Sequence, residues 1–118
     1  MKTRSAVRTA AALCAALFAG AAPAKEIVLE VIAPTQEREA IVWNVNREIT
    51  GFRVEVVEGR PIINKVKIVR GEEWGVGAYF APGQPLEKRW DTPRQAGQVG
   101  ANLDNARQTK LRLVVYTR

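Results

Sequence analysis

The sequence predicts an all-β fold, a small antiparallel β-sandwich of about six to seven strands that follows a cleaved N-terminal signal peptide. Short runs of β-branched and aromatic residues recur along the chain, turn residues separate these runs, and no stretch after the signal has the spacing of an amphipathic helix. Parallel strands would need crossover helices between them, so the strands are expected to pair antiparallel. A small β-barrel is the alternative arrangement.

The first 24 residues have the three parts of a secretory signal peptide. A basic start leads into the apolar run 10–22, and Ala22-Pro23-Ala24 then gives the small-x-small pattern that precedes cleavage. The run is shorter than the about 20 apolar residues that a transmembrane helix needs. We therefore expect Sec-type cleavage between Ala24 and Lys25. This would leave a single domain over residues 25–118, without a transmembrane segment, in the periplasm or outside the cell.

The composition excludes several classes of function. The chain has no histidine, and its one cysteine, Cys14, and one serine, Ser5, both lie in the predicted signal peptide. The mature chain therefore cannot carry a Ser-His-Asp triad, a Cys-His dyad, or a Cys/His site for zinc, haem or iron–sulfur clusters. We predict no catalytic residue, no cofactor and no metal.

The positive charge of the chain comes partly from the signal peptide. Three of the 18 basic residues and none of the 12 acidic residues lie there, so cleavage lowers the formal net charge from +6 to +3. The remaining charges alternate in sign along the chain. Nucleic acid is therefore not expected as a partner.

The first two predicted strands follow the cleavage site. Residues 26–32 are apolar and β-branched and are ended by Pro34, and residues 39–45 form a second such run that the polar pair Asn46-Arg47 closes.

The next two runs, residues 49–59 and 61–71, are expected to form a hairpin. A three-residue loop at 59–61 would pair Val54 with Val66. The same register pairs Phe52 with Ile68 and places Glu55 opposite Lys65.

The second half of the chain gives two further strands. Residues 74–80 alternate large side chains with Gly75 and Gly77, and the bare face indicates a bulge or close approach by another backbone. Residues 86–106 are polar and are expected to hold one or two short strands in a long loop. Residues 111–116 alternate again and form the closing strand.

One stretch combines aromatic rings with cations in the way a carbohydrate or extended-peptide surface does. The tentative binding residues are Tyr79, Lys88, Arg89, Trp90 and Arg94. The alternative is that Trp90 fastens a loop onto the sheet. The two large rings nearby are interpreted as core residues; these are Trp74 and Phe80.

A basic stripe is possible on one sheet face, formed by Lys65, Lys67 and Arg70 with Arg53 opposite. Such a stripe could meet an anionic glycan, lipopolysaccharide or an acidic envelope protein. A solvated face is the more ordinary interpretation.

The remaining oxygen ligands and carboxylate pairs favour no site. Asn102, Asp104 and Asn105 lie in a glycine-flanked segment that predicts an Asx turn rather than a calcium site. Two acidic pairs are close enough for acid–base chemistry, Glu72-Glu73 and Glu37 with Glu39, and neither has a supporting motif.

No motif in the sequence identifies a protein family. The leading hypothesis is an exported, non-enzymatic binding module for an envelope protein or an anionic glycan. The alternatives are a structural component that lends an edge strand to an envelope complex, and an enzyme that acts on polysaccharides through carboxylates.

Overall fold

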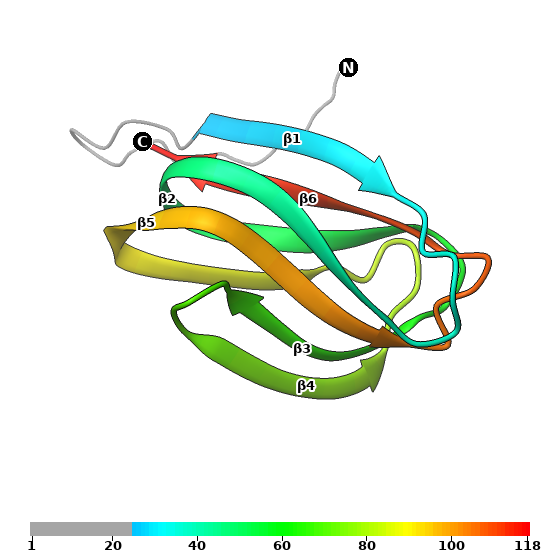
Figure 1. Cartoon of the computed structure of the whole chain (residues 1–118). Coiled ribbons are helices and arrows are strands. Elements are labelled where there is room, and N and C mark those ends of the chain that lie inside the picture. The colour runs from blue at the N-terminus through cyan, green and yellow to red at the C-terminus, as the bar shows by residue number, and fades with distance from the viewer. Residues whose placement is uncertain (1–24) are drawn as a thin grey trace, which may run out of the picture.

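A computed structural model describes residues 25–118, so the predicted signal peptide lies outside the described residues and Lys25 is the first residue of a strand. The six strands are β1 (Lys25–Ile32), β2 (Glu39–Glu58), β3 (Ile62–Ile68), β4 (Glu73–Tyr79), β5 (Leu86–Asp104) and β6 (Lys110–Thr117) (Figure 1). They form one antiparallel sheet in the order β1-β6-β2-β5-β3-β4. The predicted all-β antiparallel class is confirmed. Residues 25–118 contain no helix that could cross a membrane.

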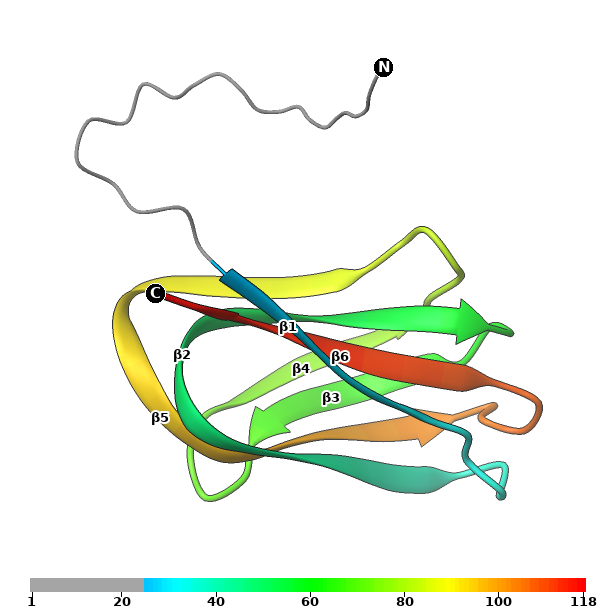
Figure 2. The ribbon, with the colours of Figure 1, turned by 90° about the horizontal axis from the view of Figure 1, so that it is seen from above.

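The sheet is folded over because its two longest strands bend. Figure 2 shows β2 and β5 turning at the same end of the molecule. In β2 the bend begins at Asn46, whose φ of 52° lies in the left-handed region, and the register with β5 shifts there. A second shift separates the pairs Ile49–Arg94 and Gly51–Arg89, so residues 90–93 of β5 bulge outward.

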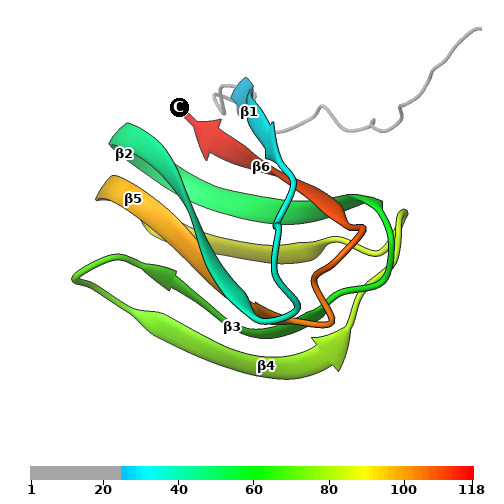
Figure 3. The ribbon, with the colours of Figure 1, turned by 45° about the vertical axis from the view of Figure 1, so that its right-hand side comes forward.

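The bend divides the sheet into two layers, with the core between them (Figure 3). The first layer contains β1, β6, residues 51–58 of β2 and residues 86–89 of β5. The second layer contains residues 39–49 of β2, residues 94–104 of β5, β3 and β4. The largest fully buried core side chains come from both layers: Trp43, Phe52, Ile49, Ile63, Leu103, Leu111, Leu113, Val54, Val66 and Val99.

β1 and β4 are the two edges of the sheet, and tryptophan side chains pack where the two layers meet. Trp43 of β2 donates a hydrogen bond from its indole nitrogen to the backbone oxygen of Glu30 on β1, at 2.9 Å. Trp74 of β4 stacks on Trp90 of β5, with ring centroids 5.9 Å apart, and both rings meet Phe52 edge-on.

The predicted hairpin of the third and fourth runs is wrong. β2 pairs with β5 and β6, whereas β3 pairs with β4 and β5. Val54 and Val66 are both buried but lie in different layers, because the chain crosses between the layers after Gly59, where φ is +89°. The alternation correctly indicated that Phe52, Val54, Val66 and Ile68 face the core, but it could not distinguish a strand partner from the opposite layer. It also placed Asn64 with Val66 and Ile68, whereas the register shift between Ile63 and Lys65 leaves Asn64 on the outer face.

Two other predictions also fail. Residues 86–106 are not a loop with short strands, because β5 continues through 19 residues. Likewise, Asn46-Arg47 does not end a strand: β2 continues for 20 residues through the bend.

Of the two interpretations of the β4 glycines, the structure shows the bulge and not the close approach by another backbone. Between the pairs Ile63–Ala78 and Lys65–Gly75 the register shifts, and Gly77 has a φ of +66°, so the predicted bulge is present. Among the described residues no backbone covers the bare face of this strand, since a Cβ built on Gly75 or Gly77 would meet nothing within 4 Å.

Candidate functional site

The outer face of the first layer carries a network of charged side chains, which we call the ion-pair face. It consists of Glu26, Arg53, Glu55, Glu87, Arg89, Arg112 and Tyr116. These residues occupy the alternate positions of the first-layer strands that point away from the core. Each glutamate accepts at least one hydrogen bond from an arginine of the same face.

Tyr116 lies at the centre of the ion-pair face. Its side chain is only 1% exposed although it lies outside the core cluster. Arg53 donates to the phenol oxygen at 2.9 Å, and the hydroxyl donates to Glu87 at 2.8 Å. Gly51 leaves room for the ring, and the Arg89 guanidinium lies 4.1 Å from the ring centroid. The ring is therefore enclosed by its own chain.

The hydrogen bonds of this face fix its protonation states. Partial burial raises the pKa of Glu55, but the hydrogen bonds from Arg53 and Arg112 outweigh it and hold the pKa below its ordinary value. Burial also raises the pKa of Tyr116, so the phenol remains a donor to Glu87.

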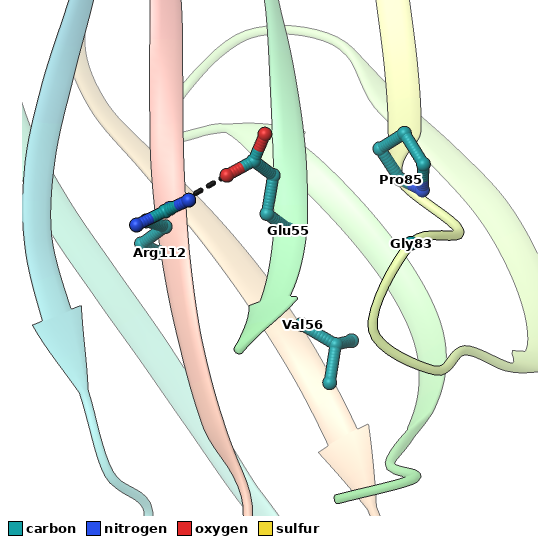
Figure 4. A pocket seen from close by; sticks show the side chains of 5 residues that line it. All are labelled: Glu55, Val56, Gly83, Pro85 and Arg112. Atoms are coloured by element: carbon teal, nitrogen blue, oxygen red, sulfur yellow. Dashed lines mark hydrogen bonds and ion pairs between the residues drawn. The ribbon is translucent and has the colours of Figure 1, made fainter. Parts of the chain in front are cut away.

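A small hollow of about 170 Å³ lies at the edge of the ion-pair face. Figure 4 shows the Glu55 carboxylate directed toward Arg112, with Gly83 and Pro85 of the β4–β5 connection on the other side. Arg112 donates to this carboxylate at 2.6 Å. The single carboxylate in this hollow is thus bound to an arginine.

The tryptophan pair is covered by cations of the same chain. The Lys88 ammonium lies 5.8 Å from the centroid of Trp74, and the Arg94 guanidinium lies 4.7 Å from that of Trp90. Arg94 also forms an ion pair with Glu72. Both rings are partly buried against the core, as is Phe80. This arrangement matches the alternative in which Trp90 fastens its segment to the sheet.

The outer face of the second layer is different, and we call it the amide face. Its residues are Ala40, Val42, Asn44, Asn64, Lys65, Lys67, Glu73, Gly75, Gln98, Gly100 and Asn102. It carries few ion pairs and includes two glycines. Three hollows lie along it.

Two of these hollows lie on either side of Arg38. The Tyr79 hollow has a volume of about 500 Å³, and its lining includes Ile62, Tyr79 and Asn105. The Asn102 hollow has a volume of about 280 Å³, and its lining includes Asn64 and Asn102. The third, the Gln98 hollow, lies near the bend with about 300 Å³; its lining is Asn44, Asn46, Val69, Arg70, Gly97 and Gln98.

Arg38 lines both of these hollows, and its partner Asp104 lines the Tyr79 hollow. Asp104 accepts hydrogen bonds from Arg38 at 2.7 Å and from Asn64 at 2.8 Å. These two hydrogen bonds hold the pKa of Asp104 below its usual range, and the bond from Asn64 has the larger effect. The Arg38 side chain is 85% exposed, so most of its guanidinium faces solvent.

Asn102 contributes a buried acceptor to this region. Its side-chain oxygen has almost no exposed surface and no hydrogen-bond donor among residues 25–118. Buried polar atoms are normally paired, so an unpaired one next to a hollow marks a place where a ligand donor would be stabilised. Tyr79 lines the Tyr79 hollow on the other side of Arg38 and is 55% exposed. The Arg60 guanidinium lies 5.2 Å from the centroid of its ring.

The structure does not bring the five predicted binding residues together. Trp90 belongs to the tryptophan pair, and Lys88 and Arg94 lie over its rings. Arg89 points to the opposite face of β5 and joins the ion-pair face. Tyr79 lies at the far end of β4, in the Tyr79 hollow. Side chains alternate between the two faces of a continuous strand, so Arg89 points away from the face of Lys88 and Trp90. The predicted loop did not include this alternation.

The predicted basic stripe is only partly correct. Lys65 and Lys67 share the amide face and Arg70 lies at its end. Arg53 does not oppose them, because the hairpin that placed it there does not form and it binds Glu26 and Tyr116 instead.

The amide and acidic residues singled out in the sequence take other places. Asn102 and Asp104 belong to β5 rather than to a loop, and only Asn105 of the three lies in the connection to β6, where its φ is 52° and its side-chain nitrogen donates to the Arg60 carbonyl oxygen. Within residues 25–118 no group of three or more acidic side chains is arranged to hold a metal ion.

Three of the four glutamates in the two acidic pairs bind separate groups. Glu72 pairs with Arg94 and Glu73 with Lys65. Glu39 accepts hydrogen bonds from the backbone nitrogens of Thr35 and Gln36 and so closes the loop before β2.

Comparison with known protein families, curated protein sequences and solved structures found no match to this chain.

Proposed function

We propose that this chain is an exported, non-catalytic binding module that holds a polyhydroxylated ligand against the amide face. The observation that carries the proposal is the buried oxygen of Asn102, which has no donor among residues 25–118 and borders a hollow shared with Arg38 and Asn64. A sugar hydroxyl would supply the missing donor.

Two features around this oxygen support a saccharide. Tyr79 offers an exposed ring beside the same arginine, and a ring of this kind packs on the apolar face of a sugar. The amides of Asn64 and Asn102 can both donate and accept, which suits vicinal hydroxyl groups.

The proposal of a non-catalytic role is supported by the state of the carboxylates. Glu55 and Glu87 are bound to arginines, and Asp104 accepts bonds from Arg38 and Asn64, which keeps its pKa low. Carboxylates held in the ionised form are poorly suited to donate a proton to a glycosidic oxygen.

A glycan microarray probed with the labelled protein tests this proposal. We expect binding to a subset of glycans, and we expect Tyr79→Ala and Asn102→Ala each to weaken it by about fivefold. Val57→Ala, an exposed substitution on β2 outside the amide face, is the control and should bind like the unmodified protein. Circular dichroism of each variant establishes that it is folded. Unchanged binding by both site variants would contradict the proposal.

A second candidate function is favoured by the β1 edge, where Val28 and Val31 are 60% and 46% exposed. Such an edge could add a strand to an envelope complex. Size-exclusion chromatography separates the two functions: a monomer that binds glycans supports the module, and a stable assembly that Val28→Lys dissociates supports the structural component.

A further inference from the structure

We propose that the ligand is a linear polyanionic polysaccharide that lies along β3, across the amide face, from the Tyr79 hollow to the Gln98 hollow. This inference rests on the proposed function and names the class of ligand.

The Tyr79 hollow and the Gln98 hollow lie at the two ends of β3. Ile62, at the start of β3, pairs with Tyr79 and Asp104, and these three residues line the Tyr79 hollow. Val69, directly after the end of β3, lines the Gln98 hollow and donates a backbone hydrogen bond to the Gln98 carbonyl oxygen at 3.0 Å. Seven residues of strand span about 20 Å. A ligand that occupies both ends must therefore be extended.

The surface between the hollows carries two glycines. Gly75 pairs with Lys65, and Gly100 pairs with Lys67, so the two glycines lie beside the two lysines. A Cβ on Gly75 would meet nothing within 4 Å, whereas one on Gly100 would contact the Ile41 backbone oxygen at 3.4 Å, Val42 at 3.6 Å and Lys67 at 3.7 Å. Such a surface accepts a chain lying along the strand.

Lys65 and Lys67 give this surface a preference for an anionic ligand. Lys65 and Lys67 are two positions apart on one strand and so project from the same face about 7 Å apart. Arg38 and Arg70 add a cation near each end. Glu73 is the one carboxylate paired to these lysines in residues 25–118, at 3.3 Å from Lys65. Regularly spaced anionic groups along a ligand would match this row.

The ends of the face favour sugars over other polyanions. The Gln98 hollow is lined by three amides, and Gln98 donates to Asn44 at 2.9 Å, so amide groups are presented as an ordered set. The centre lacks aromatic rings on which bases of a nucleic acid could stack. A peptide strand gains its main affinity from a sheet edge, whereas these groups lie on a sheet face.

The test is fluorescence anisotropy of the protein with labelled oligouronates of increasing length. We expect affinity to rise with length until the chain spans the face and then to level off. Lys67→Gln should weaken binding about threefold at low salt. Glu73→Gln, which releases Lys65 from its partner, should strengthen binding about twofold; this gain cannot come from misfolding.

A matched ion pair elsewhere provides the control. Lys110 and Glu58 pair at 3.4 Å across β6 and β2, with exposures similar to those of Lys65 and Glu73. Lys110→Gln and Glu58→Gln should leave the affinity unchanged. Equal effects from this pair would show that only net charge matters and would overturn the proposal.

Other outcomes separate the two proposals. If Tyr79→Ala weakens binding of a glycan whose affinity ignores charge and length, the binding module stands and the linear polyanion is wrong. If poly-L-glutamate competes as well as the oligouronate, an acidic peptide replaces the polysaccharide. If no glycan binds, both proposals fall.

Discussion

The two outer faces of the folded sheet use their polar side chains in opposite ways. On the ion-pair face the glutamates and arginines bind one another around Tyr116, which is 1% exposed. On the amide face the buried oxygen of Asn102 has no donor among residues 25–118, and Gly75 leaves the surface open. The charged groups of the ion-pair face thus bind one another, while the amide face has fewer ion pairs and keeps one buried acceptor without a donor among the described residues.

This difference shows that charge density alone is a poor guide to a binding surface. The ion-pair face has the most charged side chains, yet it functions as a second packed layer: Val114 is also 1% exposed while lying outside the core cluster. Val114 pairs with Arg53 across β6 and β2, and Arg112 lies two positions before it on the same face of β6. We therefore expect the ion-pair face to contribute to stability, and we propose recognition only for the amide face.

The largest expected effect on stability comes from Gly51 on the ion-pair face, and Gly75 on the amide face is its matched comparison. A Cβ on Gly51 would lie 2.6 Å from the Lys88 backbone oxygen and 3.0 Å from the Tyr116 ring, so Gly51→Ala must push β2 away from β5. We expect a loss of about 3 kcal/mol in the free energy of unfolding, measured by urea denaturation. Gly75→Ala, on the open face, should change it by less than about 0.5 kcal/mol. Equal losses would remove the distinction between the faces.

The two tyrosines give the next test. Tyr116→Phe removes a hydroxyl that joins Arg53 to Glu87, and it should lower the free energy of unfolding by about 2 kcal/mol. Tyr79→Phe removes an exposed hydroxyl on the other side of the molecule and should cost less than about 0.5 kcal/mol. If the first variant were as stable as the unmodified protein, the network around Tyr116 would contribute nothing.

Several parts of the fold followed from the sequence. The alternation in residues 111–116 predicted β6, and the β-branched run at 26–32 predicted β1, because a half-buried strand needs this pattern. The bends were not predictable in the same way. Asn46 and the segment 90–93 look like strand breaks, since turn residues also occur where a strand bends or bulges without ending.

The candidate site was harder to predict for the same reason. Tyr79 was singled out because it is an aromatic residue in a segment that also holds cations, whereas Arg38 and Asn64 carry no local signal and meet Asp104 only in the folded chain. Arg89 was misplaced because its face depends on the continuity of β5. A strand assignment through residues 86–104 would have separated it from Trp90.

The response to acid should also differ between the faces. Glu55 has a pKa below its ordinary value in the folded state, so its contribution is complete above the unfolded pKa of about 4.3 and is lost as the pH falls through the folded pKa. We expect urea denaturation at pH 6 and pH 3 to show a loss of stability, and we expect Glu55→Gln to reduce that loss by about 1 kcal/mol, allowing for solvent screening. Asp104→Asn should flatten the profile less, because the Asp104 side chain is 31% exposed against 19% for Glu55 and solvent screens its ion pair more strongly. The reverse order would place the stabilising network on the amide face.

The smallest expected effect concerns the one ion pair in the middle of the amide face. A double-mutant cycle on Lys65 and Glu73 should give a coupling of about 0.3 kcal/mol that falls further in high salt, as is usual for exposed pairs. The pair Lys110 and Glu58 should give the same value, since its geometry and exposure are similar. A weak coupling is what the amide face requires, because a lysine held firmly by its own chain could not turn toward a ligand. A coupling above about 1 kcal/mol that persists in salt would make Lys65 part of a closed network, and the amide face would then resemble the ion-pair face.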